Sequence, residues 1–110
     1  MRQSERQAIR AIKSRVRANA YIYSEEAWLD TARGFLHEDD VKRAVSTARL
    51  VTVAEDDASR MWYTLCGFGT DEEPIMVVCR VRKAEIEIAS VFRLTRPDPQ
   101  APGGTFLEHP

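Results

Sequence analysis

The second half of the chain contains three strand-like segments separated by two short turns, and no other feature limits the fold as strongly. The segments at 61–68, 75–82 and 85–94 are rich in β-branched and aromatic residues, which favour extended backbone. An acidic stretch ending at Pro74 forms the first turn, and residues 83–84 form the second. Strands joined by such short turns pair in antiparallel order, so the sequence predicts a β-meander.

The first half of the chain shows helical periodicity instead. Apolar residues recur there at spacings of three and four, and acidic residues stand at the second and third helix starts, where they complement the helix dipole. A further short strand follows the last helix. The sequence predicts helices at 4–19, 24–34 and 38–48, a short extended segment at 20–23 and a strand at 50–54.

These elements predict one α+β domain over residues 1–94. We expect the N-terminal helices to pack on one face of a four-stranded antiparallel β-meander. A chain of 110 residues is long enough for one core and too short for a second. Residues 95–110 are rich in Pro and Gly and have little to bury, so we expect a flexible C-terminal tail.

Composition excludes several classes of protein. The formal net charge is −1 and the pI is about 6.1, so no global positive field marks a nucleic-acid binder. The longest apolar run, at 74–79, is far shorter than the roughly 20 residues that span a bilayer, and no signal peptide is visible. We expect a cytoplasmic protein without membrane contact. Cys66 and Cys79 lack further ligands at metal spacing, so we expect reduced cysteines, no metal site and no cofactor.

The pairing of the last two strands sorts residues into two faces. With 83–84 as the connection, Arg80 lies opposite Glu87 and Arg82 opposite Glu85, which joins opposite charges. If residues 70–73 form the preceding turn, one face is a core. Its predicted members are Trp62, Thr64, Cys66, Phe68, Ile75, Cys79, Val81, Ile86, Ile88 and Phe92.

The predicted second face is polar at one end and apolar at the other. A solvated sheet face seldom carries so much apolar surface, so something is expected to cover it: the tail, a helix, a second copy of the chain or a partner. If the cover is another molecule, the chain is a homodimer or binds a partner protein. The predicted interface then comprises Leu65, Met76, Val78 and Val91.

Several segments resemble a known family. They are Tyr-Ile-Tyr-Ser-Glu-Glu-Ala at 21–27, Phe-Leu-His-Glu-Asp-Asp-Val at 35–41, Leu-Cys-Gly-Phe-Gly at 65–69, Pro-Ile-Met-Val-Val-Cys at 74–79 and Ile-Glu-Ile-Ala-Ser-Val-Phe at 86–92. Over about residues 8–99 the chain resembles the bacterial domain-of-unknown-function family 4258. The resemblance implies a RelE-like or MqsR-like small toxin fold, action on RNA, and a cognate zinc-finger antitoxin as partner.

Two positions differ from the pattern of that family. Its members commonly have a histidine near the start of the second helix, where this chain has Glu26. Their last strand often ends in a tyrosine, where this chain has Phe92. An inactive or repurposed member of the family is therefore one alternative.

The predicted second face also suggests a catalytic site. A metal-independent ribonuclease must deprotonate the ribose 2′-hydroxyl, stabilise the phosphate and protonate the leaving oxygen. Tyrosine can exchange protons and arginine can bind phosphate. Tyr63, Arg80 and Arg82 lie together in the predicted register, with Arg93 farther along, and these four are the catalytic candidates. The alternative is that the arginines only form cross-strand ion pairs.

A basic stripe follows the first helix. Arg6, Arg10, Lys13 and Arg17 repeat at spacings of four, three and four, which places them on one side of the helix. Arg10, Lys13 and Arg17 are candidates for contacts with an RNA backbone, and a solvated helix face is the alternative reading. Two functions are therefore expected from different classes: an RNA-directed toxin, or a non-catalytic interaction or dimerisation domain on the same fold.

Overall fold

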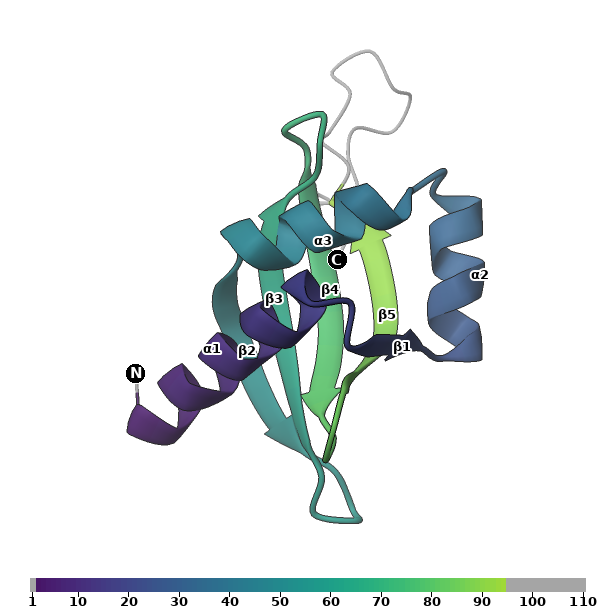
Figure 1. Cartoon of the computed structure of the whole chain (residues 1–110). Coiled ribbons are helices and arrows are strands. Elements are labelled where there is room, and N and C mark those ends of the chain that lie inside the picture. Colours follow the sequence, from purple (N-terminus) through teal and green to yellow (C-terminus); the bar gives the residue numbers. More distant parts are fainter. Residues whose placement is uncertain (1, 95–110) are drawn as a thin grey trace, which may run out of the picture.

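The computed structural model describes residues 2–94, which form three helices and five strands (Figure 1). The helices are α1 (Gln3–Arg17), α2 (Glu25–Arg33) and α3 (Glu38–Thr47). The strands are β1 (Tyr21–Tyr23), β2 (Arg49–Glu55), β3 (Met61–Phe68), β4 (Pro74–Val81) and β5 (Ile86–Arg93). The α+β class is as predicted, and the predicted tail at 95–110 lies outside the described residues.

The five strands form one sheet in the order β1-β5-β4-β3-β2. Strands β2 to β5 form an antiparallel meander, but β1 pairs in parallel with β5. The prediction of a four-stranded antiparallel sheet is therefore wrong, and the observed sheet is mixed. Three residues are too few to show alternation, and the partner of Tyr21 is the distant Ile86, so only tertiary contact reveals this strand.

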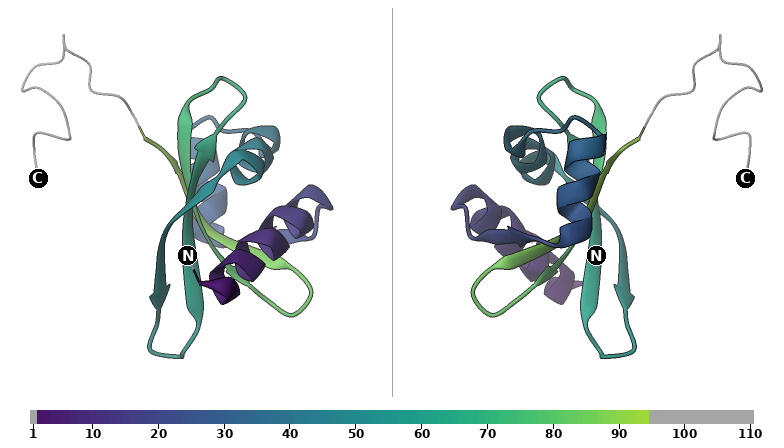
Figure 2. Two further views of the ribbon diagram at one scale, coloured as in Figure 1. Left: turned by 90° about the vertical axis from the view of Figure 1, so that its left-hand side faces the viewer. Right: turned by 90° about the vertical axis from the view of Figure 1, so that its right-hand side faces the viewer.

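Helices α1 and α3 lie across one face of the sheet, and α2 lies beside its β5 edge (Figures 1 and 2). The core lies between these helices and the sheet. Its largest fully buried side chains come from α1, α3 and the three central strands. They are Ile12, Val16, Val41, Val45, Leu65, Ile75, Val77, Cys79, Ile86, Ile88 and Val91. The opposite sheet face carries no helix of residues 2–94, and we call it the open face.

Helix α2 covers the part of the β5 edge that β1 leaves free. Strand β1 pairs only with residues 86–88. Beyond them, the Asp30 carboxylate accepts hydrogen bonds from the Val91 backbone N–H at 3.2 Å and from the Ser90 hydroxyl at 2.9 Å. Unpaired backbone groups on an edge strand invite pairing with other chains. Asp30 therefore protects this edge of the sheet.

Strand β3 faces the opposite way from the prediction. Leu65 lies opposite Val77 and Tyr63 lies opposite Cys79, so both side chains are on the face that the helices cover. The turn before β4 comprises residues 69–73, where the prediction used 70–73. A difference of one residue moves every side chain of a strand to the other face. The residues wrongly predicted to join the core from β3 are Trp62, Thr64, Cys66 and Phe68, which lie on the open face.

A β-bulge changes the facing of β5. Arg80 lies opposite Glu87 as predicted, but the partner of Val78 is Ser90, which leaves Ala89 without a partner. Such an extra residue reverses the alternation of the strand beyond it.

Because of the bulge and the shifted turn, the four residues of the predicted interface lie on two different faces of the sheet. Leu65 and Val91 are fully buried in the core, so their predicted position on the second face is wrong. Met76 and Val78 are half-buried on the open face. Phe92, predicted in the core, is 44% exposed there. The open face therefore has an apolar region, but with a different set of side chains from the one predicted.

Asp40 joins the start of α3 to the β3–β4 turn. Its carboxylate is 5% exposed and accepts hydrogen bonds from the backbone N–H groups of His37 and Thr70, each at 3.0 Å, and from the Thr70 hydroxyl. Burial opposes ionisation, but the hydrogen bonds from Thr70 and His37 outweigh it, so the pKa of Asp40 is lowered. The charged carboxylate therefore holds the turn against the helix.

We expect Asp40→Asn to lower the free energy of unfolding by about 1.5–3 kcal/mol at pH 7, because hydrogen bonds to a buried charge are lost. The folded pKa of Asp40 lies below its unfolded value of about 3.9, so its contribution is present at neutral pH and is lost as the pH falls through the folded pKa. The difference between wild type and variant should narrow between pH 7 and about pH 3 in urea unfolding. Asp39→Asn, at an exposed neighbour, is the control. An equal difference at both pH values would contradict this role.

Candidate nucleic-acid interface

The structure keeps Arg80, Arg82 and Glu87 together on the open face. The Arg80 guanidinium pairs with the Glu87 carboxylate at 3.0 Å and lies 5.5 Å from the centre of the Trp62 ring. Arg82 lies 3.8 Å from the same carboxylate. Both arginines therefore already have a carboxylate partner, which a phosphate would have to replace.

Tyr63 reaches this region from the other face of the sheet. It packs against the core, and burial first, then Glu5 and Cys79, raise the pKa of its phenol. Tyr63 and Arg80 share only the wall of a hollow of about 330 Å³, which Arg60, just before the start of β3, also lines. A phenol with a raised pKa is rarely deprotonated at neutral pH, so Tyr63 is poorly suited to act as a general base.

Arg93 lies at the far end of β5. Its partner in β4 is Ile75, whereas Arg80 lies opposite Glu87. The six residue steps of strand from Glu87 to Arg93 span about 20 Å. The Arg93 guanidinium pairs with Glu73 and donates to the backbone oxygen of Gly34 at 2.9 Å. The four predicted catalytic residues thus do not converge in one cleft.

A different set of charges gathers over α1, α3 and the start of β2. One hollow of about 280 Å³ lies between α1 and α3, and a second of about 370 Å³ lies between α1 and β2, where Ile9, Ala48 and Leu50 provide apolar walls. Lys13 lines both hollows. The basic residues around the two hollows, which we call the cationic face, are Arg6, Arg10, Lys13, Arg17, Lys42, Arg43 and Arg49.

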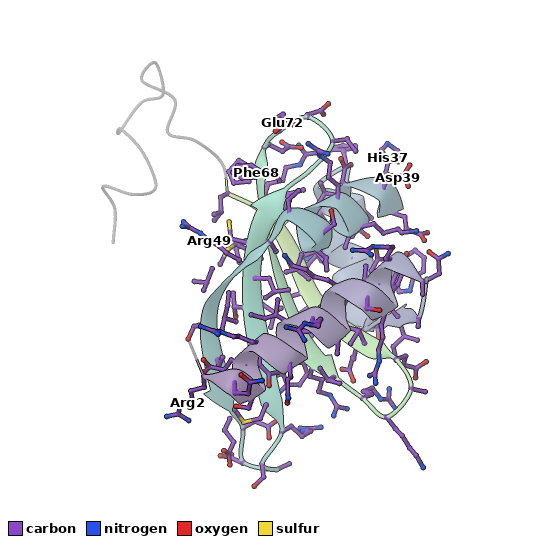
Figure 3. The ribbon with its side chains drawn as sticks, turned by 60° about the vertical axis from the view of Figure 1, so that its left-hand side comes forward. Arg2, His37, Asp39, Arg49, Phe68 and Glu72 are labelled. Atoms are coloured by element: carbon purple, nitrogen blue, oxygen red, sulfur yellow. The ribbon has the colours of Figure 1, made fainter. Side chains whose placement is uncertain are left out.

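Figure 3 looks towards the cationic face, with α1 across the front and Arg49 labelled at the left. The cationic face includes all three predicted RNA-binding residues, Arg10, Lys13 and Arg17, together with basic residues from α3 and β2. Sequence pattern could not predict that addition, because Lys42, Arg43 and Arg49 join the stripe only when α3 and β2 pack beside α1.

Most of the cationic face has no acidic partner. Arg43 pairs with Glu72 at 2.5 Å, and Lys42 donates to the Asn19 side chain at 2.6 Å. Within residues 2–94, no carboxylate lies within ion-pairing distance of the other five basic residues. A net charge of −1 therefore conceals a strongly positive side of the molecule.

An aromatic hollow of about 430 Å³ lies beside β1, and the sequence patterns did not indicate it. Tyr21, Tyr23 and Trp28 line it together with Asn19, Ile22 and Glu38. The Tyr-x-Tyr spacing, which places both rings on one side of a strand, is the signal that could have revealed it. Burial raises the pKa of Tyr23 to about 12, with a smaller contribution from Glu38, so its phenol stays protonated and uncharged at physiological pH.

Residues 2–94 contain neither a metal-binding cluster nor a disulfide. No three His, Cys, Asp or Glu side chains of this part of the chain lie together as a metal ion would require. Both cysteines are free, Cys79 in the core and Cys66 on the open face. No helix within the same residues has the length and apolar character needed to span a membrane.

Comparison with known proteins agrees with the resemblance seen in the sequence. No curated protein and no solved structure matches the chain. A family described as a domain of unknown function does match, over residues 23–93. That region begins at the last residue of β1 and ends with β5, so it includes the open face and the Tyr23, Trp28 and Glu38 side of the aromatic hollow, but not α1. Because the match covers more than half of the chain, the protein belongs to the family Domain of unknown function (DUF4258).

Proposed function

We propose that the protein binds RNA through the cationic face, as an RNA-directed toxin of the RelE-like or MqsR-like kind. The observation that supports this best is the gathering of seven basic side chains from three elements on a chain of net charge −1. If the basic and acidic residues were evenly mixed over the surface, there would be no cationic face. The cognate partner implied by the sequence resemblance is a zinc-finger antitoxin.

The geometry of α1 suits a nucleic-acid backbone. Arg10 and Arg17 lie two helical turns apart, about 10 Å along the axis, and Lys13 lies between them on the same side. Cations in a row along a strand displace the counterions of successive phosphates, which gives binding that depends strongly on salt and little on sequence. Arg49 extends the row beyond the helix.

We expect the double variant Arg10→Ala/Arg17→Ala to bind single-stranded RNA more weakly than wild type. Loss of two phosphate contacts should reduce the slope of log affinity against log salt by about 1.4, because each contact contributes about 0.7 for single strands. Fluorescence anisotropy with a labelled oligoribonucleotide at several salt concentrations measures both quantities. Alanine is a good helix former, so α1 should remain folded.

The matched control removes the same charge elsewhere. Arg33 and Lys83 are exposed and lie in α2 and in the β4–β5 turn, outside the cationic face. Arg33→Ala/Lys83→Ala should leave the affinity and the salt slope close to those of wild type. Equal losses in both double variants would mean that only net charge matters, and no binding by wild type would overturn the RNA proposal.

Toxicity is tested separately from binding. Induced expression in a bacterial host should arrest growth and deplete transcripts, and co-expression of the antitoxin should reverse both. Arg80 and Arg82 are the candidates for stabilising a phosphate during cleavage, so Arg80→Ala should reduce transcript loss. RNA binding without growth arrest would remove the toxin part of the proposal and leave the binding part intact.

A further inference from the structure

The aromatic hollow brings three rings together at different angles. Tyr21 and Tyr23 are two residues apart on β1, and their ring centres lie 5.7 Å apart with a tilt of 50°. The Tyr23 and Trp28 rings lie 5.3 Å apart and nearly perpendicular. Rings arranged in this way form two or more walls of a site, whereas a parallel stack would fill it. Trp28 is 64% exposed, an unusual position for so large an apolar side chain.

The charge around the hollow is negative. Glu38 lines it, and its carboxylate accepts a hydrogen bond from the Tyr21 hydroxyl. The pKa of Tyr21 is raised by burial first and then by Glu38, with Asp39 also contributing, which reports a negative potential at this ring. Among residues 2–94, no basic side chain lines the hollow. Lys42 donates a hydrogen bond to the side-chain oxygen of Asn19 but lines the hollow between α1 and α3 instead.

We propose that the aromatic hollow binds a quaternary ammonium group. Aromatic ring faces attract cations, and several rings at different angles with one carboxylate form the kind of cage that binds such groups. An unmodified ammonium is strongly hydrated and needs an acceptor for each of its three N–H groups, whereas ring faces supply none and the one carboxylate that lines the hollow is shared with Tyr21. A quaternary ammonium has no N–H group to satisfy, so ring faces and one carboxylate are sufficient. The group can belong to a free choline-like molecule or to a trimethylated lysine of a partner protein.

A nucleotide fits this hollow less well. A base could stack on Trp28, but its phosphate would lie near Glu38 and Asp39, which repel it. The unpaired cations that suit phosphate lie instead on the cationic face, lined by different residues. This inference therefore does not depend on the proposed RNA binding, and either can fail without the other.

The first experiment compares choline with 3,3-dimethyl-1-butanol, which has the same shape without the charge. Titration of the full chain, followed by NMR shifts of the β1 backbone amides, should show saturable binding of choline and weaker binding of the neutral compound. Trp28→Ala should weaken choline binding about fivefold, as expected for loss of one cation–π contact of about 1 kcal/mol. Because Trp28 is mostly exposed, that variant should stay folded.

Two further variants test the carboxylate and provide a control. Glu38→Gln should weaken choline binding but not binding of the neutral compound. Leu29→Ala, at an exposed position of α2 that does not line the hollow, should leave choline binding unchanged. Equal binding of choline and the neutral compound, or no binding of either, would overturn the inference. Displacement of choline by adenosine monophosphate would overturn it in favour of a nucleotide.

The source of the group is distinguished with peptides. A short peptide containing trimethyllysine is compared with the same peptide containing unmodified lysine. If the natural ligand is a side chain, the trimethylated peptide should bind more tightly than choline and the unmodified peptide more weakly. If it is a free small molecule, choline should bind at least as tightly as the trimethylated peptide. Equal affinity for both peptides would contradict selectivity for a quaternary group.

Discussion

Replacement of Gly67 by alanine is expected to lower the free energy of unfolding by about 3 kcal/mol or more, the upper end of overpacking effects. A Cβ atom at Gly67 would lie 1.8 Å from the backbone oxygen of Ala44 and 2.8 Å from the Thr47 hydroxyl oxygen. No rotamer change relieves a clash with backbone, so α3 would have to move away from β3. That movement would also break the 2.9 Å hydrogen bond from the Phe68 N–H to Thr47.

The size of this effect is judged against a second glycine. A Cβ atom at Gly34 would approach the Asp30 backbone oxygen no closer than 3.3 Å, and its φ of −86° suits any residue. Gly34→Ala should therefore change stability by less than about 1 kcal/mol. Urea unfolding of both variants provides the comparison. Similar stabilities for the two would show that α3 does not press on β3 at Gly67.

Leu65→Ala is expected to cost about 2–5 kcal/mol, the range for deleting a fully buried leucine side chain. The reason is its position: Leu65 is 0% exposed and faces Val77 beneath the helices. On the open face, where the simple alternation pattern put it, the same change would cost much less. The free energy of unfolding of this one variant therefore tests the register of β3.

Val78 provides the matched position on the open face. Val78→Ala should cost less than about 1 kcal/mol, because its side chain is only half-buried and has no helix over it. A larger cost for Val78→Ala than for Leu65→Ala would reverse the assignment of the faces. The more severe Val78→Lys, examined by sedimentation, tests the dimerisation alternative. If wild type is a monomer and Val78→Lys sediments in the same way, the dimerisation alternative is wrong.

Local sequence pattern was sufficient for most of the elements. Period-3.6 spacing marked α1 and α3, and acidic residues marked the start of α3 within one residue. The pairing of Arg80 with Glu87 followed from opposite charges across a short turn and is confirmed. These features depend on neighbours in the sequence, and so they can be read from it.

The facing of the strands could not be read in the same way. A turn one residue longer than expected reversed β3, and the bulge at Ala89 reversed the end of β5. Both errors place the wrong side chains in the core, because alternation fixes only the relative facing of residues within one strand. Tyr63 therefore lies on the opposite face of the sheet from Arg80, and the predicted catalytic residues do not form one cluster.

The sequence by itself determined the α+β class, the antiparallel meander and the basic stripe on α1, since these follow from short-range periodicity and charge. Only the tertiary structure decided that β1 joins β5, that Leu65 lies inside, and that Lys42, Arg43 and Arg49 join the stripe. It also brought Trp28 and Glu38 to the two tyrosines of β1. These groupings join residues from separate elements, and packing of the helices on the sheet is what sets the distances between them.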